Sequence, residues 1–247
     1  MALAVDVRGL WRGLAVMILA LLVGHLVGMV FIYGFDHDYV FGLVPFFSLD
    51  GEGNLPAWFS AGLLFFSAQL LFLTGTAERR AGRPWGGWMG LSAVFAFLTV
   101  DELSAFHEKI GWAVGDRVGA EGLLHEYFWV WVYGPIVVLL GLVYLRFLGR
   151  MPRRVRWTMI LAAVLYVGGS VGVEVLGSPF WNDDPELRRW PYLALVGVEE
   201  MLEMFGISVF IRAILLYQAH MGLVISVRDG EDTAEAPGIP AAADMPG

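Results

Sequence analysis

The chain has 247 residues, of which 57% are hydrophobic and only 16% are charged, with a mean hydropathy of +0.65. A soluble domain of this size needs about a quarter of its residues charged to cover its surface, so this composition excludes an ordinary soluble domain and indicates that lipid surrounds most of the chain. The net charge of −8 says little about partners. The lack of a basic patch interleaved with aromatic residues argues against a nucleic-acid partner, and the absence of cysteine excludes disulfides and thiolate ligands.

Six apolar segments are long enough to cross a bilayer, which takes about 20 residues in a helix. They cover residues 10–34, 57–76, 86–111, 126–148, 157–177 and 191–217. The first segment is not a cleaved signal peptide, because its apolar core is too long and no small-residue cleavage site follows it. We therefore predict an all-α fold, a polytopic bundle of six transmembrane helices over residues 1–220.

Arginine residues indicate the orientation of these six spans. Arg8 and Arg12 lie at the start of the first span, and further arginines lie in the connections between spans two and three and between spans four and five. The other three loops carry few basic residues, and these are mixed with acids. Because short cytoplasmic loops are enriched in lysine and arginine, both termini are predicted to be cytoplasmic. Residues 221–247, rich in alanine, proline, glycine and acids, are predicted to form a disordered acidic cytoplasmic tail.

Ionisable side chains gather in the outer half of this predicted bundle. Spans three, five and six supply eight of them, namely Asp101, Glu102, His107, Glu108, Glu174, Glu199, Glu200 and Glu203. With a rise of ~1.5 Å per residue, Asp101 lies roughly 15 Å below the outer boundary and Glu203 about 18 Å below it. His25, His125 and Glu126, in the outer parts of spans one and four, are further candidates for the same layer.

Helical periodicity predicts that these side chains point into the bundle. The three glutamates of span six fall within a single arc of about 100°. On a continuous third helix, Asp101 and Glu108 share one stripe, and Glu102 and His107 flank it on opposite sides. Each charged group can therefore face the interior of the bundle and avoid lipid.

The cost of burying charge in lipid favours a function for this layer. An unpaired acid at the centre of a transmembrane helix costs about 2.5–3.5 kcal/mol, so several acids on one span need protonation, hydration or a cation. The structural alternative is a hydrogen-bonded polar core or a rim at the membrane interface. That alternative explains Glu108, His125 and Glu126 equally well, because they lie close to water, but it explains the deeper acids less well.

Carboxylates and imidazoles together are suitable ligands for Zn, Mn or Fe. We therefore expect a divalent metal site in this layer, whose use would be hydrolytic or redox work on a lipid or small amphiphile from the membrane. The chain has no His-Glu-x-x-His, which excludes a zincin mechanism, and no Glu-x-x-His, the usual ligand pair of di-iron bundles. Two alternatives stay open, proton- or cation-coupled transport and a non-catalytic accessory subunit whose acids serve only packing.

The predicted outer loop between spans one and two, residues 46–60, contains Asp50, Glu52 and Asn54 alternating with glycines. It superficially resembles a calcium loop, but the EF-hand spacing and its distal bidentate glutamate are absent. The favoured interpretation is a turn followed by the start of an interfacial helix, with Pro56 near the first helical position. The alternative is a lid over the outer cavity.

Three motifs together resemble a family of uncharacterised bacterial multipass membrane proteins: LDGEGNLPAWFS in the first outer loop, DELSAFHE at the end of span three and EEMLEMFG in span six. The resemblance covers most of residues 10–217 and implies a bacterial inner (cytoplasmic) membrane location, but it implies no reaction. A fainter likeness is to ceramidase-type membrane hydrolases, which gather histidine and acid ligands at one membrane face. Their cluster of zinc histidines has no clear equivalent, because only His25, His107 and His125 are in reach.

Overall fold

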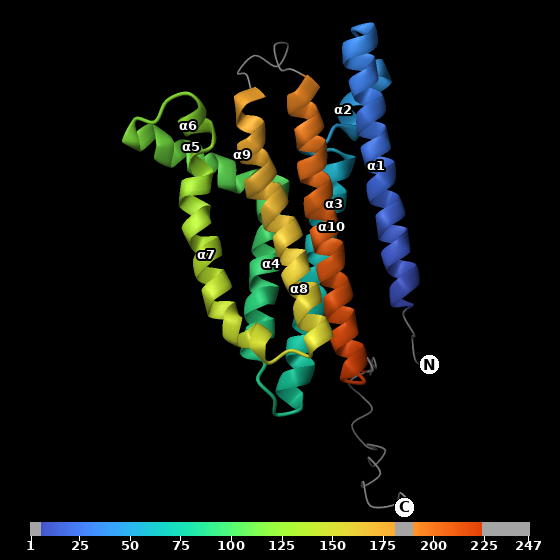
Figure 1. The fold of residues 1–247 in the computed structure, drawn as a ribbon, viewed down its shortest axis with the longest axis vertical. Coiled ribbons are helices and arrows are strands. Elements are labelled where there is room, and N and C mark those ends of the chain that lie inside the picture. Colours follow the sequence, from blue (N-terminus) through green and yellow to red (C-terminus); the bar gives the residue numbers. More distant parts are fainter. Residues whose placement is uncertain (1–5, 181–189, 224–247) are drawn as a thin grey trace, which may run out of the picture.

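The structure, a computed structural model, describes residues 6–180 and 190–223, and the regular elements in this part are all helices (Figure 1). The longer helices are α1 (Val7–Phe35), α3 (Leu55–Arg80), α4 (Gly86–Ser104), α5 (Phe106–Val118), α7 (Phe128–Gly149), α8 (Arg153–Val167) and α10 (Trp190–His220). Short helical segments join them: η1 (Val40–Gly42), α2 (Leu43–Phe47), α6 (Leu123–Glu126), the π-helix η2 (Gly168–Val173), α9 (Glu174–Gly177) and η3 (Ser178–Phe180). The predicted all-α fold class is confirmed, and residues 224–247 of the predicted tail lie outside the described part.

Four helical stretches in the described part are long and apolar enough to cross a membrane: α1, α3, α7 and the run from α8 to η3. The pair α4 and α5 makes a fifth if the two count as one bent span. The sixth predicted span corresponds to α10, which is not among these stretches. Several long apolar helices thus support a membrane protein.

The helices run back and forth between two ends of the bundle (Figure 1). We call the end that α5 crosses, at the top of Figure 1, the α5 end, and the opposite end the arginine end. At the arginine end α3 finishes with Arg79 and Arg80, and α8 begins at Arg153. Helix α1 also begins at this end, and α10 finishes there, so the first and last helices have their outer termini at the same end of the bundle.

Helix α10 forms the centre of the bundle, between α8 and α1 (Figure 1). Its half nearer the arginine end is buried and mainly apolar, with Ile207, Ile211 and Ile214 in the core. Small residues allow α8 and η2 to approach it closely. A Cβ added at Gly206 would lie 2.8 Å from the backbone nitrogen of Tyr166, and one added at Gly169 would lie 2.9 Å from the carbonyl oxygen of Glu199. A side chain larger than hydrogen at either glycine would push the helices apart.

The third predicted span is not one continuous helix, and this part of the prediction is wrong. Helix α4 ends at Ser104, and Ala105 adopts a left-handed conformation with φ 44° and ψ 46°. Helix α5 then departs at 74° to α4 and crosses the α5 end of the bundle (Figure 1). Left-handed backbone is uncommon for alanine, so composition gave no signal of the break. Close packing holds α5 in place, because a Cβ on Gly111 would lie 2.6 Å from the Trp129 nitrogen of α7.

Candidate functional site

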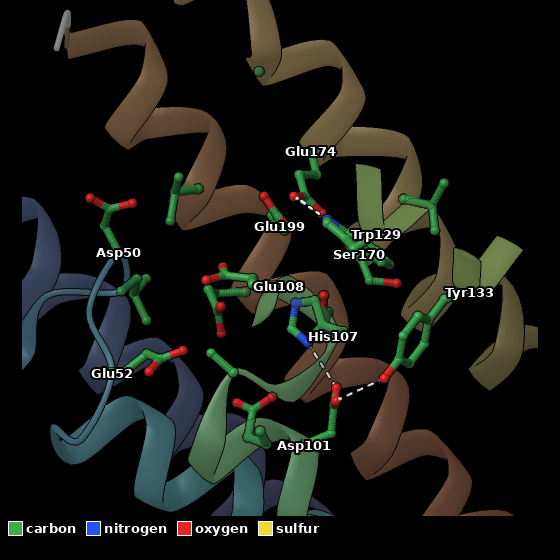
Figure 2. A pocket seen from close by; sticks show the side chains of 18 of the residues that line it. Asp50, Glu52, Asp101, His107, Glu108, Trp129, Tyr133, Ser170, Glu174 and Glu199 are labelled. Carbon is green, nitrogen blue, oxygen red and sulfur yellow. Dashed lines mark hydrogen bonds and ion pairs between the residues drawn. The ribbon is translucent and has the colours of Figure 1, made fainter. Parts of the chain in front are cut away.

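A cavity of about 280 Å³ lies toward the α5 end of the bundle, and Figure 2 shows many of its side chains. Its walls come from α4, α5, α7, α10, the run from α8 to α9, and the loop that precedes α3. All eight side chains predicted for the outer layer line it: Asp101, Glu102, His107, Glu108, Glu174, Glu199, Glu200 and Glu203. Asp50 and Glu52 add two more acids, so the described lining has nine carboxylates and one imidazole, with no lysine or arginine. We call this space the acidic cavity.

The break at Ala105 creates a carboxylate–imidazole pair at the floor of the acidic cavity. Because α5 turns back over the end of α4, the Nδ1 of His107 lies 2.8 Å from an oxygen of Asp101 (Figure 2). The hydroxyl of Tyr133 lies 3.5 Å from the other oxygen of Asp101 and donates to it. The His107 ring also packs edge-on against Trp129, with 4.9 Å between ring centroids. A continuous helix would have placed Asp101 and His107 on different faces, so the predicted stripe through Asp101 and Glu108 is replaced by this pair.

These contacts fix which nitrogen of His107 remains available. A carboxylate can only accept a hydrogen bond from the imidazole, so Nδ1 carries a proton that it donates to Asp101. The Nε2 atom then faces the acidic cavity, on the side where Glu174 and Glu199 lie in Figure 2. Glu108 and Glu174 are close enough to act electrostatically on the ring.

The π-helix η2 precedes Glu174 and helps to place it. A π-turn takes one more residue than an α-turn, and such turns are frequent at functional sites. Both Ser170 in η2 and Glu174 just after it line the acidic cavity (Figure 2). The indole Nε1–H of Trp129 donates to Glu174 over 2.9 Å, which links α9 to α7.

The three glutamates of α10 line the acidic cavity from the opposite side, as helical periodicity predicts. Glu203 is the deepest, with 9% of its surface exposed. Among the described residues, no side-chain or backbone group donates a hydrogen bond to Glu199, Glu200 or Glu203. The oxygens of these three residues are therefore available to a ligand.

The loop before α3 forms one wall of the acidic cavity, and sequence reasoning did not include its acids among the site residues. Asp50 accepts a hydrogen bond from the Tyr192 hydroxyl of α10 over 3.1 Å. Asn54 accepts from the Ala57 N–H over 3.2 Å and so caps α3. The predicted turn and helix start are both present, and the alternation of acids with glycines was the signal that the loop also reaches the cavity.

Two of the three further candidates of the predicted layer, His25 and His125, are not part of the acidic cavity. His25 is buried, and its Nδ1 accepts from the Leu49 N–H over 3.1 Å. Its Nε2 therefore carries the proton and donates to the carbonyl of Leu193 over 3.0 Å, so both nitrogens serve structure. His125 pairs with Asp116 of α5 at 2.9 Å, outside the cavity lining. The side chain of Glu126 lies outside the described part of the structure.

The side chains as they stand do not form a ready coordination shell. In residues 6–180 and 190–223, no three His, Asp or Glu side chains converge closely enough to hold a metal ion. Coordination in the acidic cavity would require some carboxylates to rotate toward a common point. Glutamates without hydrogen bonds to hold them, such as Glu199 and Glu203, are the side chains best able to do so.

Fold and cavity together define an all-helical protein of membrane type with an acid-lined cavity toward one end. Residues 13–218 match a family model described as a domain of unknown function, DUF8692, and the chain belongs to this family. No curated protein and no solved structure matches the chain. The family match agrees with the resemblance to uncharacterised proteins that the sequence motifs indicated.

Proposed function

We propose that this protein crosses a bacterial inner membrane six times and binds a divalent metal ion, Zn, Mn or Fe, in its acidic cavity. In this proposal α10 is the sixth span, the arginine end is cytoplasmic together with both termini, and the α5 end faces outward. The arginines gathered where α3 ends and α8 begins support this orientation under the positive-inside rule.

The uncompensated charge of the acidic cavity carries the proposal. Six of its carboxylates come from α4, α9 and α10, and two of them, Asp101 and Glu203, are buried: Asp101, Glu102, Glu174, Glu199, Glu200 and Glu203. No lysine or arginine stands among the described residues that line it. Buried carboxylates in a lipid-enclosed site are costly unless protonated or matched by positive charge, so the cavity is built to attract a cation.

The pairing of His107 with Asp101 favours a metal ion as that cation. Histidines that ligate metals almost always donate their other ring N–H to a carboxylate or carbonyl, which fixes the ring and raises its basicity. His107 has this arrangement, with Nε2 left toward the cavity. Nitrogen and oxygen donors of this kind suit Zn, Mn or Fe. When bound, such an ion would polarise a water molecule or a carbonyl group, and a carboxylate left uncoordinated could accept the proton.

The core beneath the acidic cavity favours a binding site over a conduit. Below Glu203, α10 presents Met204, Ile207 and Ile211 to the bundle, all at most 2% exposed. This apolar layer separates the cavity from the arginine end. Proton- or cation-coupled transport is therefore the second candidate, and it requires a conformation that opens this layer.

Metal content of the purified protein tests the proposal. The protein is purified in detergent, exposed separately to Zn, Mn and Fe, freed of excess metal and measured by elemental analysis. We expect about one tightly held ion per wild-type chain and at least about tenfold less in Glu199→Gln/Glu203→Gln. Asp116→Asn, in the same half but outside the cavity lining, is the matched control and should keep its metal.

Near-zero metal in both the wild type and Asp116→Asn would overturn the metal proposal. Proton uptake into proteoliposomes, lost in Glu200→Gln, would then establish the transport alternative. Metal held equally by all variants would instead place the ion outside the acidic cavity.

A further inference from the structure

One wall of the acidic cavity is mainly apolar and comes from two helical stretches, α7 and the run from α8 into η2. On α7 this wall consists of Tyr133 and Val137, and on the facing run from α8 into η2 it consists of Val167 and Val171. Helix α7 makes few close backbone contacts with α8 or η2. We call this opening the α7–η2 slot, defined by these four residues.

Helix α7 is held at its two ends and is open between them. At the α5 end it packs through Trp129 against Gly111. Toward the arginine end the Tyr144 hydroxyl donates to the carbonyl of Gly87 over 3.1 Å. Between these contacts Val137 is 37% exposed although it lines the cavity, and Val138 is 63% exposed. Since α7 and α8 belong to candidate membrane spans, hydrocarbon chains are what surrounds this opening in a bilayer.

The acidic cavity and the slot differ in the chemistry that they offer a ligand. The cavity offers carboxylates, with the aromatic rings of Trp129 and Tyr133 beside them, and this combination suits an ammonium group and repels an anionic one. A divalent ion would engage only some of these carboxylates, which leaves others to pair with an organic cation. The slot offers valine side chains in contact with hydrocarbon.

We propose that the acidic cavity receives the ammonium headgroup of a membrane lipid whose acyl chain leaves through the α7–η2 slot. Val137 lies eight residues beyond Trp129 on α7, about 12 Å along the axis, so headgroup and chain are separated by a distance that one lipid molecule spans. The proposal rests on the membrane location given under Proposed function and shares its cavity, but it does not require the metal ion.

Photo-crosslinking in nanodiscs tests this inference. The discs consist of phosphatidylglycerol and contain either a phosphatidylethanolamine probe or a phosphatidylglycerol probe, each with a diazirine in one acyl chain. We expect the ethanolamine probe to label the peptides around Val137 and Val171 about tenfold more than the glycerol probe, the ratio that a modest headgroup preference gives. Val137→Trp should reduce this labelling to the level of the glycerol probe, because the indole fills the slot. Val138→Trp, one residue along and outside the cavity lining, should leave it unchanged.

Equal labelling by the two probes, or equal labelling of the two tryptophan variants, would overturn the inference and indicate only surrounding bulk lipid. If Val137→Trp fails to fold, Val171→Phe narrows the slot from its other wall and must give the same loss. Metal content is measured on the same preparations. Selective lipid labelling without metal contradicts the metal proposal alone, and metal without headgroup preference contradicts the lipid inference alone.

Discussion

Two buried glutamates, one near each end of the bundle, are stabilised in opposite ways. Glu78, near the arginine end, is 3% exposed and receives two hydrogen bonds from Arg83, over 2.8 and 2.9 Å. This pair raises the pKa of the Arg83 guanidinium, through its hydrogen bond to the carboxylate. Glu203, in the acidic cavity, is 9% exposed, and no lysine or arginine stands among the described residues around that cavity.

The difference separates a structural acid from one kept for a ligand. Where the acid has only to be buried, the chain supplies a bidentate arginine, which matches a carboxylate geometrically as well as electrically. In the acidic cavity the chain gathers acids and leaves the positive charge to come from outside. Two substitutions test this difference directly, and a third tests the helix break that shapes the acidic cavity.

The largest effect is expected from Arg83→Met. This change leaves the buried Glu78 without its counter-charge, and removing one partner of such a pair is strongly destabilising. Thermal unfolding in detergent should show a marked fall in Tm, with partial recovery in Arg83→Met/Glu78→Gln. Arg80→Met, at the exposed end of α3, is the control and should change Tm little. Equal effects of Arg83→Met and Arg80→Met would show that Glu78 does not depend on the pair.

Glu203→Gln should have the next largest effect, in the opposite direction. It removes an acid that no described basic side chain compensates, so the metal-free protein should gain stability, by at most about 2 kcal/mol, the cost of an ionised acid in this environment. The same variant should lose stabilisation by added Zn or Mn, measured by thermal shift. Glu78→Gln is the comparison, because it breaks a satisfied pair and should lower stability. Destabilisation by Glu203→Gln would mean that Glu203 belongs to a satisfied structural network.

The smallest effect is expected from Ala105→Gly, at the break that brings His107 onto Asp101. Glycine adopts the left-handed conformation of this residue without the penalty that a Cβ incurs, so stability should rise by about 1 kcal/mol. Ala113→Gly, inside α5, should instead cost about 1 kcal/mol. Chemical or thermal unfolding of both variants measures the contrast. A loss of stability in Ala105→Gly would indicate that the break relaxes in solution.

The apolar length of the spans made the helices predictable, but the bend between α4 and α5 could not be predicted. Each predicted span has a helix at its place, because a run of apolar residues long enough to cross a bilayer can satisfy its backbone only as a helix. The bend at Ala105 could not be predicted, since it depends on the packing of Gly111 against α7, which follows in the chain.

The acidic cavity was predictable only in part. Depth along antiparallel helices brought the acids of α4, α9 and α10 to one level, and they line one cavity. The alternation of acids with glycines marked the loop that carries Asp50, but the hydrogen bond that Asp50 accepts from Tyr192, 142 residues further along the chain, could not be read from that loop alone. His25 is the opposite case, a residue that was a candidate for the layer but does not line the cavity. Its depth matched that of the acids, but both of its ring nitrogens form hydrogen bonds to the backbone, with Leu49 and Leu193.

The imidazole of His25 joins three parts of the chain that are otherwise far apart. It is carried by α1, accepts from Leu49 in the loop that also carries Asp50 and Glu52, and donates to Leu193 of α10. Sliding or tilting of α1 against α10 must stretch one of these two hydrogen bonds. A peripheral helix is thereby mechanically coupled to the rim of the acidic cavity, and bilayer thickness or tension that shifts α1 acts on Asp50 without touching it.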